Sequence, residues 1–301
     1  MQNVLYGVEP SVVICADSEL GMARWAEAIA AVGARASLTL PIAGAIERLD
    51  DQPPADVMLV DAADDGGDAL DRLLDRLNGA ASRGYPGVVN VAPALIDIAA
   101  ARVPHKDVTV LCDASGLERA GALGFALAAR PQAMFRERGD ESPMQLRRLS
   151  EEVGRIARAL ATLSSTERSV DMLSPAMARD HGANVEMPGA VPIRAMIRAR
   201  RLRDQYFESE LFADPAWDML LDLLLARAER RPVAVSSLCI AASVPPTTAL
   251  RWIKRLTDEG LFVRTADPRD GRRVFIDLSD AAADAMASYF HATARVGLSF
   301  A

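Results

Sequence analysis

Near the C-terminus, hydroxyl and basic side chains recur at a spacing that could bind phosphate and base edges. Hydroxyl and free N–H groups at the start of a helix bind phosphate oxygens, and an arginine one turn further in reaches guanine O6 and N7. Such a set of residues predicts contact with the major groove of DNA. The set consists of Thr247, Thr248, Arg251, Lys254 and Arg255.

A second basic group lies in the polar turn ADPRDGRR, residues 266–273. An arginine on a projecting loop can enter a narrow minor groove, and a neighbouring aspartate can fix its guanidinium fork. Any one of these arginines could be a solvated charge, but their joint placement beside Asp267 and Asp270 favours contact with DNA. The arginines of this turn are Arg269, Arg272 and Arg273.

Residues 193–301 alternate helices and strands in an order that would position both groups. A helix begins at Asp214-Pro215, Ser236 or Ser237 caps a short helix, and the recognition helix spans Thr247–Glu259. A hairpin and a final helix follow, and Ala266–Arg273 forms the wing between the two strands. This order predicts a winged helix-turn-helix, with Ser236 and Ser237 added to the DNA-contacting set.

Residues 193–296 resemble the winged helix-turn-helix domain of the multiple-antibiotic-resistance regulator (MarR) family. The segments Val244–Arg264 and Ala266–Ser279 carry this likeness, the first with its closing Leu-x-x-x-Gly-Leu. The resemblance implies a dimer with Thr247, Thr248 and Arg251 in the major groove and Arg272 at the wing tip. A typical member has about half this length and lacks the preceding α/β domain and heptad helix, so the resemblance alone does not imply ligand binding between dimer helices.

The first 130 residues predict a doubly wound α/β domain. Short apolar, β-branched runs alternate with helical patterns such as 19–32 and 67–77, which indicates a parallel sheet buried on both faces. The overall fold class is therefore α/β plus α+β. The five predicted strands are 11–16, 34–40, 56–61, 87–91 and 107–112.

This front domain resembles the receiver domain of response regulators, a flavodoxin-like fold, with Asp61 at the end of the third strand. A working receiver also needs paired acids after strand one, a hydroxyl after strand four and a lysine after strand five. Here Ala16-Asp17 gives one acid, and strand five ends in Cys112-Asp113 with no lysine. Asp61 is thus a weak candidate phosphoacceptor in a degenerate receiver, which would signal or dimerise without a phosphate.

Residues 131–192 are predicted to form a linker and a dimerisation helix. Six apolar residues follow the 3, 4, 3, 4, 3 spacing of a heptad seam, which suits a helix paired with its two-fold mate. The alternative is a helix packed on its own domain. The seam consists of Leu146, Leu149, Val153, Ile156, Leu160 and Leu163.

Composition excludes several classes of protein. The net charge of −7 divides unevenly, with −8 in residues 1–130 and +2 in residues 191–301, so the front would repel nucleic acid. The three cysteines fit buried, reduced thiols, and neither an apolar run of membrane length nor a secretory signal is evident. No metal, cofactor or catalytic motif stands out, so we expect a cytoplasmic non-enzyme without cofactor.

Together these patterns predict a homodimeric, sequence-specific transcriptional regulator that binds double-stranded DNA and an unknown protein or small-molecule effector. Two alternatives stay open. In the first, the winged helix docks a protein partner and the acidic front domain does the signalling. In the second, the chain is a response regulator switched by phosphate at Asp61.

Overall fold

The computed structural model describes residues 9–52, 54–129 and 186–296. The described residues on either side of 130–185 belong to one compact unit, so contacts among them are treated together. The predicted heptad seam, from Leu146 to Leu163, lies outside the described residues. Dimerisation through that seam therefore stays a prediction.

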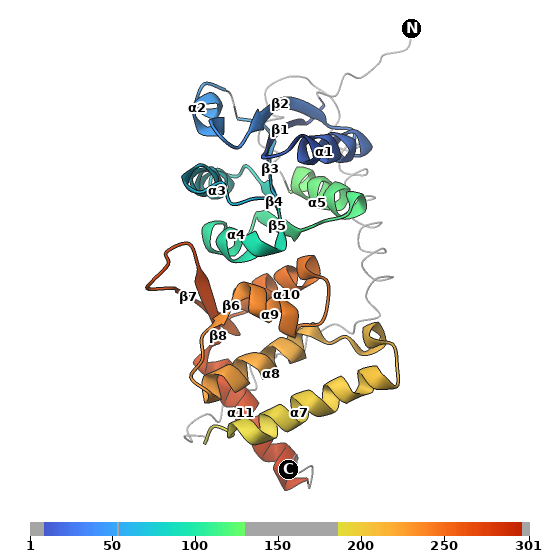
Figure 1. Ribbon diagram of the computed structural model, residues 1–301, viewed down its shortest axis with the longest axis vertical. Helices are drawn as coiled ribbons and strands as arrows, with labels where there is room; N and C mark the ends of the chain where they lie inside the picture. The colour runs from blue at the N-terminus through green and yellow to red at the C-terminus, as the bar shows by residue number, and fades with distance from the viewer. Residues whose placement is uncertain (1–8, 53, 130–185, 297–301) are drawn as a thin grey trace, which may run out of the picture. The chain divides into compact units, whose positions relative to one another are not determined.

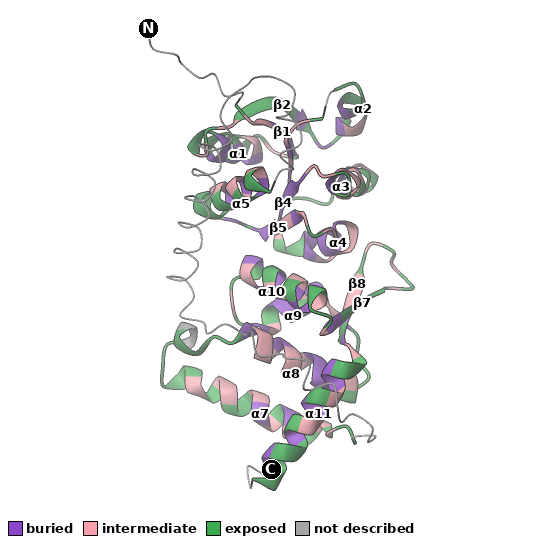
Figure 2. Ribbon diagram, turned by 180° about the vertical axis from the view of Figure 1, so that it is seen from behind, coloured by how far each residue is buried: buried purple, intermediate pink, exposed green. Residues whose placement is uncertain are grey.

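The N-terminal part forms a five-stranded parallel sheet, as the sequence predicts (Figure 1). Its order, β2-β1-β3-β4-β5, is that of a doubly wound, flavodoxin-like sheet. Every residue of β4 is buried, including the polar Asn90, because helices cover both faces of the sheet (Figure 2). The strands are β1 (Ser11–Ala16), β2 (Arg35–Pro41), β3 (Val57–Ala62), β4 (Gly87–Val91) and β5 (Val108–Cys112).

Helices lie on both faces of this sheet (Figure 1). α1 (Glu19–Ala31) and α5 (Gly116–Ala128) pack on one face, each with a serine at its N-cap. The other face carries α2 (Ala45–Asp50), α3 (Asp68–Ala81) and α4 (Ile96–Arg102). β5 is an edge strand, so its outer backbone groups need partners from outside the sheet.

The C-terminal part has the predicted winged-helix order. In the three-stranded antiparallel sheet β6-β8-β7, β6 lies between the second and third helices, and the wing joins β7 and β8. Short 3-10 turns at 203–205 and 209–212 separate the first two helices. The elements are α7 (Ala190–Leu202), α8 (Pro215–Ala228), β6 (Val233–Ala234), α9 (Val235–Ala241), α10 (Pro246–Asp258), β7 (Phe262–Ala266), β8 (Val274–Leu278) and α11 (Asp280–Arg295).

Of the two helix starts predicted from capping residues, the one at Asp214 is observed and the other is not. The Asp214 side chain accepts from the Trp217 N–H at 3.3 Å, and Gly260 ends α10 with a φ of +74°. The prediction that Ser236 or Ser237 caps α9 is wrong. α9 begins at Val235, and its N-cap residue, an alanine, has no side chain that could accept.

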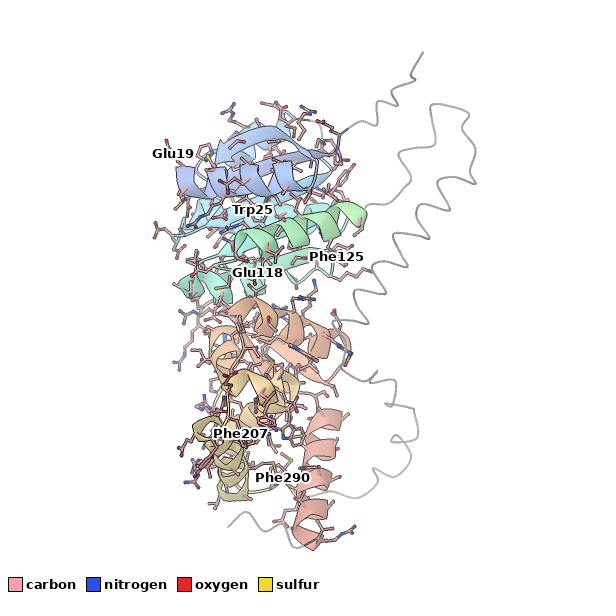
Figure 3. The ribbon with its side chains drawn as sticks, turned by 90° about the vertical axis from the view of Figure 1, so that its right-hand side faces the viewer. Glu19, Trp25, Glu118, Phe125, Phe207 and Phe290 are labelled. Atoms are coloured by element: carbon pink, nitrogen blue, oxygen red, sulfur yellow. The ribbon has the colours of Figure 1, made fainter. Side chains whose placement is uncertain are left out.

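Two apolar clusters hold the described part of the chain together. One lies between the sheet and α1 and α5, with Trp25 wholly buried between these helices (Figure 3). The other begins on the opposite face of the sheet and continues through α4 and α9 into the core of the winged helix. Among the described residues, no helix is long and apolar enough to cross a membrane.

Candidate nucleic-acid interface

α10 has the two faces that a recognition helix requires. Ala249, Leu250 and Ile253 are buried against the rest of the domain, whereas Arg251 and Arg255 are exposed. The inner face fixes the helix, and the outer face leaves long basic side chains free to reach an acidic partner. The amphipathic pattern that predicted this helix therefore also describes its packing.

The two exposed arginines of α10 differ in the contacts that their side chains make. Arg255 donates to Glu259 at 2.8 Å, and its guanidinium carbon lies 5.2 Å from the centre of the Trp252 ring. Such contacts preorganise the guanidinium plane. No hydrogen bond or ion pair to the Arg251 side chain is seen within the described residues, so Arg251 is the readier of the two to bind a new partner.

The wing is shaped by aspartates that accept from its own backbone. Asp267 accepts from the Arg269 N–H at 2.8 Å, and Asp270 accepts from the Arg272 N–H at 2.9 Å. These short side-chain-to-backbone bonds hold the loop without a regular ladder. Arg269 and Arg273 are exposed on it.

Arg272 does not point into solvent but binds two aspartates of the N-terminal domain. Its two terminal nitrogens donate to the Asp65 carboxylate at 2.6 and 3.0 Å, and its Nε donates to Asp71 at 3.1 Å. The hydrogen bonds from Arg272 are the largest cause of the lowered pKa of Asp65. The wing-tip arginine is thus held in a bidentate ion pair.

Two further predicted DNA contacts on α10 bind the edge strand β5 and the loop before it. The Thr247 hydroxyl accepts from the Cys112 N–H at 3.0 Å and donates to the Cys112 carbonyl at 3.3 Å. The Lys254 ammonium donates to the carbonyls of His105, Lys106 and Val108 at 2.6–3.0 Å. Burial lowers the pKa of Lys254, although nearby aspartates oppose the shift.

Of the two serines predicted to contact DNA, Ser236 is bound by the N-terminal domain and Ser237 is exposed. Ser236 donates from both its N–H and its hydroxyl to the two oxygens of Asp97, each at 2.8 Å. Asp97, from α4, therefore supplies the acceptor that α9 lacks at its own N-terminus. Ser237 is exposed, and Thr248 is half-buried.

One basic residue in this region was not predicted to have a role. Arg264, on β7, donates to the Ala100 carbonyl, and burial lowers its pKa. The alternation of inward and outward side chains along β7 does not indicate that Arg264 would make this contact. The acidic partners Asp65, Asp71 and Asp97 were also not predicted individually, although the acidic excess of residues 1–130 was evident.

Asp61 lies at the carboxyl end of β3 in a closed polar cluster. One of its oxygens accepts from the Trp25 indole N–H at 2.7 Å and from the Asn90 amide at 2.9 Å. A Cβ on Gly21 would lie 2.9 Å from the other oxygen, so little space is left beside it. Burial raises the pKa of Asp61, and the hydrogen bonds from Asn90 and Trp25 oppose that shift.

The acid that might have helped Asp61 bind Mg²⁺ is already engaged. Asp17 accepts from the Ala63 and Asp64 N–H groups at 2.6 and 2.9 Å, which ties down the loop after β3. Among the described residues, no three histidine, cysteine or acidic side chains are grouped to hold a metal ion. Asp61 and Asp17 are therefore both hydrogen-bonded to groups of the protein itself.

We expect that Asp61 takes no phosphate from acetyl phosphate, because its carboxylate is covered and no lysine directly follows β5 to pair with a phosphoryl group. Radiolabelled acetyl phosphate, with an intact receiver domain as positive control, measures this. Label that enters the wild type and disappears in Asp61→Asn would contradict the expectation and restore the phosphate-switched alternative.

Residues 222–282 match the family described as winged helix DNA-binding domain. This segment includes α9, α10, both wing strands and all the predicted DNA-contacting residues. The C-terminal part of the chain therefore contains a winged helix DNA-binding domain. No curated protein matches the sequence.

Solved structures of low identity are similar to about a third of the chain. A MepR mutant from S. aureus has 18% identity and a TM-score of 0.25 over 35% of this chain and 78% of its own. An E. coli MarR mutant has 21% identity and a TM-score of 0.23, over 35% of this chain and 76% of its own. A transcriptional regulator from Thermotoga maritima has 19% identity and a TM-score of 0.23, over 36% of this chain and 78% of its own.

Proposed function

We propose that the protein is a sequence-specific, DNA-binding transcriptional regulator without enzymatic activity. The match of residues 222–282 to a winged helix DNA-binding domain carries this proposal. In our proposal α10 enters the major groove and the wing, Ala266–Arg273, reaches the minor groove. In our proposal the regulator acts in the cytoplasm, as the sequence predicts.

The finer features of the proposal rest on the sequence. The MarR-type likeness of residues 193–296 suggests a homodimer on a two-fold-symmetric site, with half-sites one helical turn apart. The heptad seam from Leu146 to Leu163 would supply the pairing helix. The N-terminal domain, with Asp61 enclosed, would act as a receiver-like module that works without phosphorylation.

Arg251→Ala is expected to lower affinity for specific sites by about 1–3 kcal/mol, the usual cost of losing a bidentate contact to guanine. Capture of sheared genomic DNA by the purified protein, followed by sequencing, measures enrichment with and without the substitution. Arg198→Ala is the matched control, because Arg198 is an exposed arginine on α7, away from α10 and the wing.

The outcomes of that capture separate the alternatives. Enrichment of a few fragments by the wild type and by Arg198→Ala, lost in Arg251→Ala, supports the proposal. A uniform background whose salt dependence follows about 0.9 per neutralised phosphate would mean binding to the backbone only. Enrichment that is equal in all three proteins would contradict the role given to Arg251.

One observation favours a second function, a protein-docking module. The winged-helix surface already binds protein groups, namely the carboxylates of Asp65 and Asp97 and the backbone of β5. The same capture decides between the two functions. Retention of no DNA, even at low salt, would favour docking of a protein partner.

A further inference from the structure

We propose that the N-terminal α/β domain closes the DNA-binding surface of the winged helix and must separate from it before DNA can bind. This inference deepens the proposed function and rests on it. Three independent contacts carry it, one each from the wing, α9 and α10. In each contact, a side chain predicted to contact DNA is bound by a carboxylate or a backbone group of residues 65–112.

At the wing, carboxylates take the place that phosphate would have. Arg272 binds Asp65 through two parallel N–H···O bonds of 2.6 and 3.0 Å, the fork geometry that arginine also uses for phosphate. Asp71, itself paired with Arg102 at 2.7 Å, holds the third donor of the guanidinium. While these pairs persist, each of the three side-chain nitrogens of Arg272 donates to a carboxylate, and only two of its five N–H groups are left for DNA.

On α9, Asp97 binds both donors of Ser236, as described above. On α10, the Lys254 ammonium has three N–H donors and meets three carbonyl oxygens, so its hydrogen-bonding capacity is used up. The Thr247 hydroxyl is likewise paired with both backbone groups of Cys112. Polar recognition groups on both helices are therefore engaged.

Apolar packing accompanies these polar contacts. The cluster that runs through the interface includes Ile96 and Ala99 of α4 together with Cys239 of α9 and Leu250 of α10. Burial, with smaller contributions from Cys112 and Asp97, raises the pKa of the Cys239 thiol to about 12. The apolar residues of α4, α9 and α10 named here are all buried from solvent.

The free part of α10 faces a cleft that is shared with the N-terminal domain. Arg251 and Arg255 line a cleft of about 760 Å³ whose opposite wall includes Glu118 and Phe125 of α5 (Figure 3). A major groove about 12 Å wide has to surround the recognition helix with its two phosphate backbones. DNA can therefore reach Arg251 only when α5 and β5 are no longer beside α10.

The contact sets the affinity for DNA through the fraction of open molecules. If only that fraction binds, the apparent Kd is the intrinsic Kd divided by the open fraction. A signal that weakens the contact would raise DNA binding without changing the recognition residues. The acidic surface of the N-terminal domain is then an intramolecular competitor of DNA.

The test removes two carboxylates of the N-terminal domain from the full-length chain. Asp65→Ala/Asp97→Ala leaves every residue of the winged helix in place. The control is Asp51→Ala/Asp64→Ala, which loses the same charge from exposed aspartates that form no contact with the winged helix in the described structure. This control cancels the general gain in DNA affinity that comes from lower acidity.

Binding is measured by fluorescence anisotropy with a labelled duplex taken from the fragments enriched by genomic capture, or with a mixed-sequence duplex if none is enriched. Separation is measured independently by maleimide labelling of the thiols. Cys112 and Cys239 are buried beside the contact, whereas Cys15 is buried within the N-terminal core and reports on unfolding.

We expect the Asp65→Ala/Asp97→Ala protein to bind about ten-fold more tightly than the control, with faster labelling of Cys112 and Cys239 but not of Cys15. Equal DNA affinity with faster labelling would overturn the inhibitory role, and unchanged labelling would overturn the contact itself. Binding by none of the proteins, although labelling shows separation, would instead overturn the proposed function. Labelling of Cys15 in the variant would mean that the protein unfolds. In that case Asp65→Asn/Asp97→Asn, which keeps the side-chain volume, is tested in its place by the same measurements of DNA affinity and thiol labelling.

Discussion

Trp25→Ala is expected to lower the free energy of unfolding by about 3–5 kcal/mol, the usual cost of truncating a buried aromatic side chain. Trp25 is wholly buried and packs with α5 and the face of the sheet, so alanine would leave a cavity there. The substitution also removes the indole N–H that Asp61 accepts at 2.7 Å. A buried carboxylate with one donor fewer adds its own penalty.

Trp25→Phe separates these two effects, because it keeps most of the apolar volume and removes only the N–H. Burial already raises the pKa of Asp61 above that of the unfolded chain, and losing an opposing hydrogen bond should raise it further. The stability that a raised carboxyl pKa contributes is complete below the unfolded value and is lost as the pH rises through the folded value. The deficit of Trp25→Phe relative to wild type should therefore be larger at pH 7 than at pH 4.

Urea unfolding followed by circular dichroism, at both pH values, measures both substitutions. A Trp25→Ala deficit below about 1 kcal/mol would mean that the Trp25 site collapses around the cavity. A Trp25→Phe deficit that is the same at pH 4 and pH 7 would show that the indole N–H does not hold the charge of Asp61. The remaining support would then come from the Asn90 amide, at 2.9 Å, and from the charge of Arg119, whose Nε lies 4.0 Å from the Asp61 carboxylate.

The local elements of the fold could be predicted from the sequence because local patterns determine them. The strands at 11–16 and 87–91 were predicted with their observed bounds, since apolar runs between turn residues define both ends. The short helices α2 and α4 were not identified, because six or seven residues carry too little periodicity. The two-residue strand β6 gives even less signal and depends on pairing with β8.

The chemistry of the candidate interface was predicted only in part. The two faces of α10 follow from residues three and four apart, which a sequence displays directly. The pairing of Arg272 with Asp65 spans 207 residues, and that of Thr247 with Cys112 spans 135. No periodicity links such distant positions, so the contacts of these side chains could not be predicted.

These contacts show one effect of the uneven charge of the chain. The excess of acids in residues 1–130 would repel nucleic acid from the front half of the protein. Three of those acids, Asp65, Asp71 and Asp97, face donors on the winged helix. The same property that would keep DNA away from one domain thus attracts the surface of the winged helix that we propose to bind DNA.

Phe262→Ala is expected to destabilise the winged helix by about 3–5 kcal/mol and to weaken DNA binding with it. Phe262 is 2% exposed at the start of β7, pairs with Leu278 of β8, and belongs to the cluster that holds Leu250 and Ile253 of α10. Only Gly260 and Leu261 separate it from the end of α10 and its capping residue. The ring is therefore an anchor shared by the recognition helix and the wing.

Val263→Ala is the matched control, because Val263 follows Phe262 on the same strand but is 42% exposed, and its truncation should cost about 0.5 kcal/mol. Thermal unfolding and duplex binding are compared for both variants at a temperature where each is folded. Since the turn at Gly260 joins α10 directly to β7, losing the anchor frees the angle between recognition helix and wing. Equal DNA affinity of a folded Phe262→Ala protein and the Val263→Ala control would show that wing and helix bind DNA independently, contrary to the shared anchor inferred from their packing.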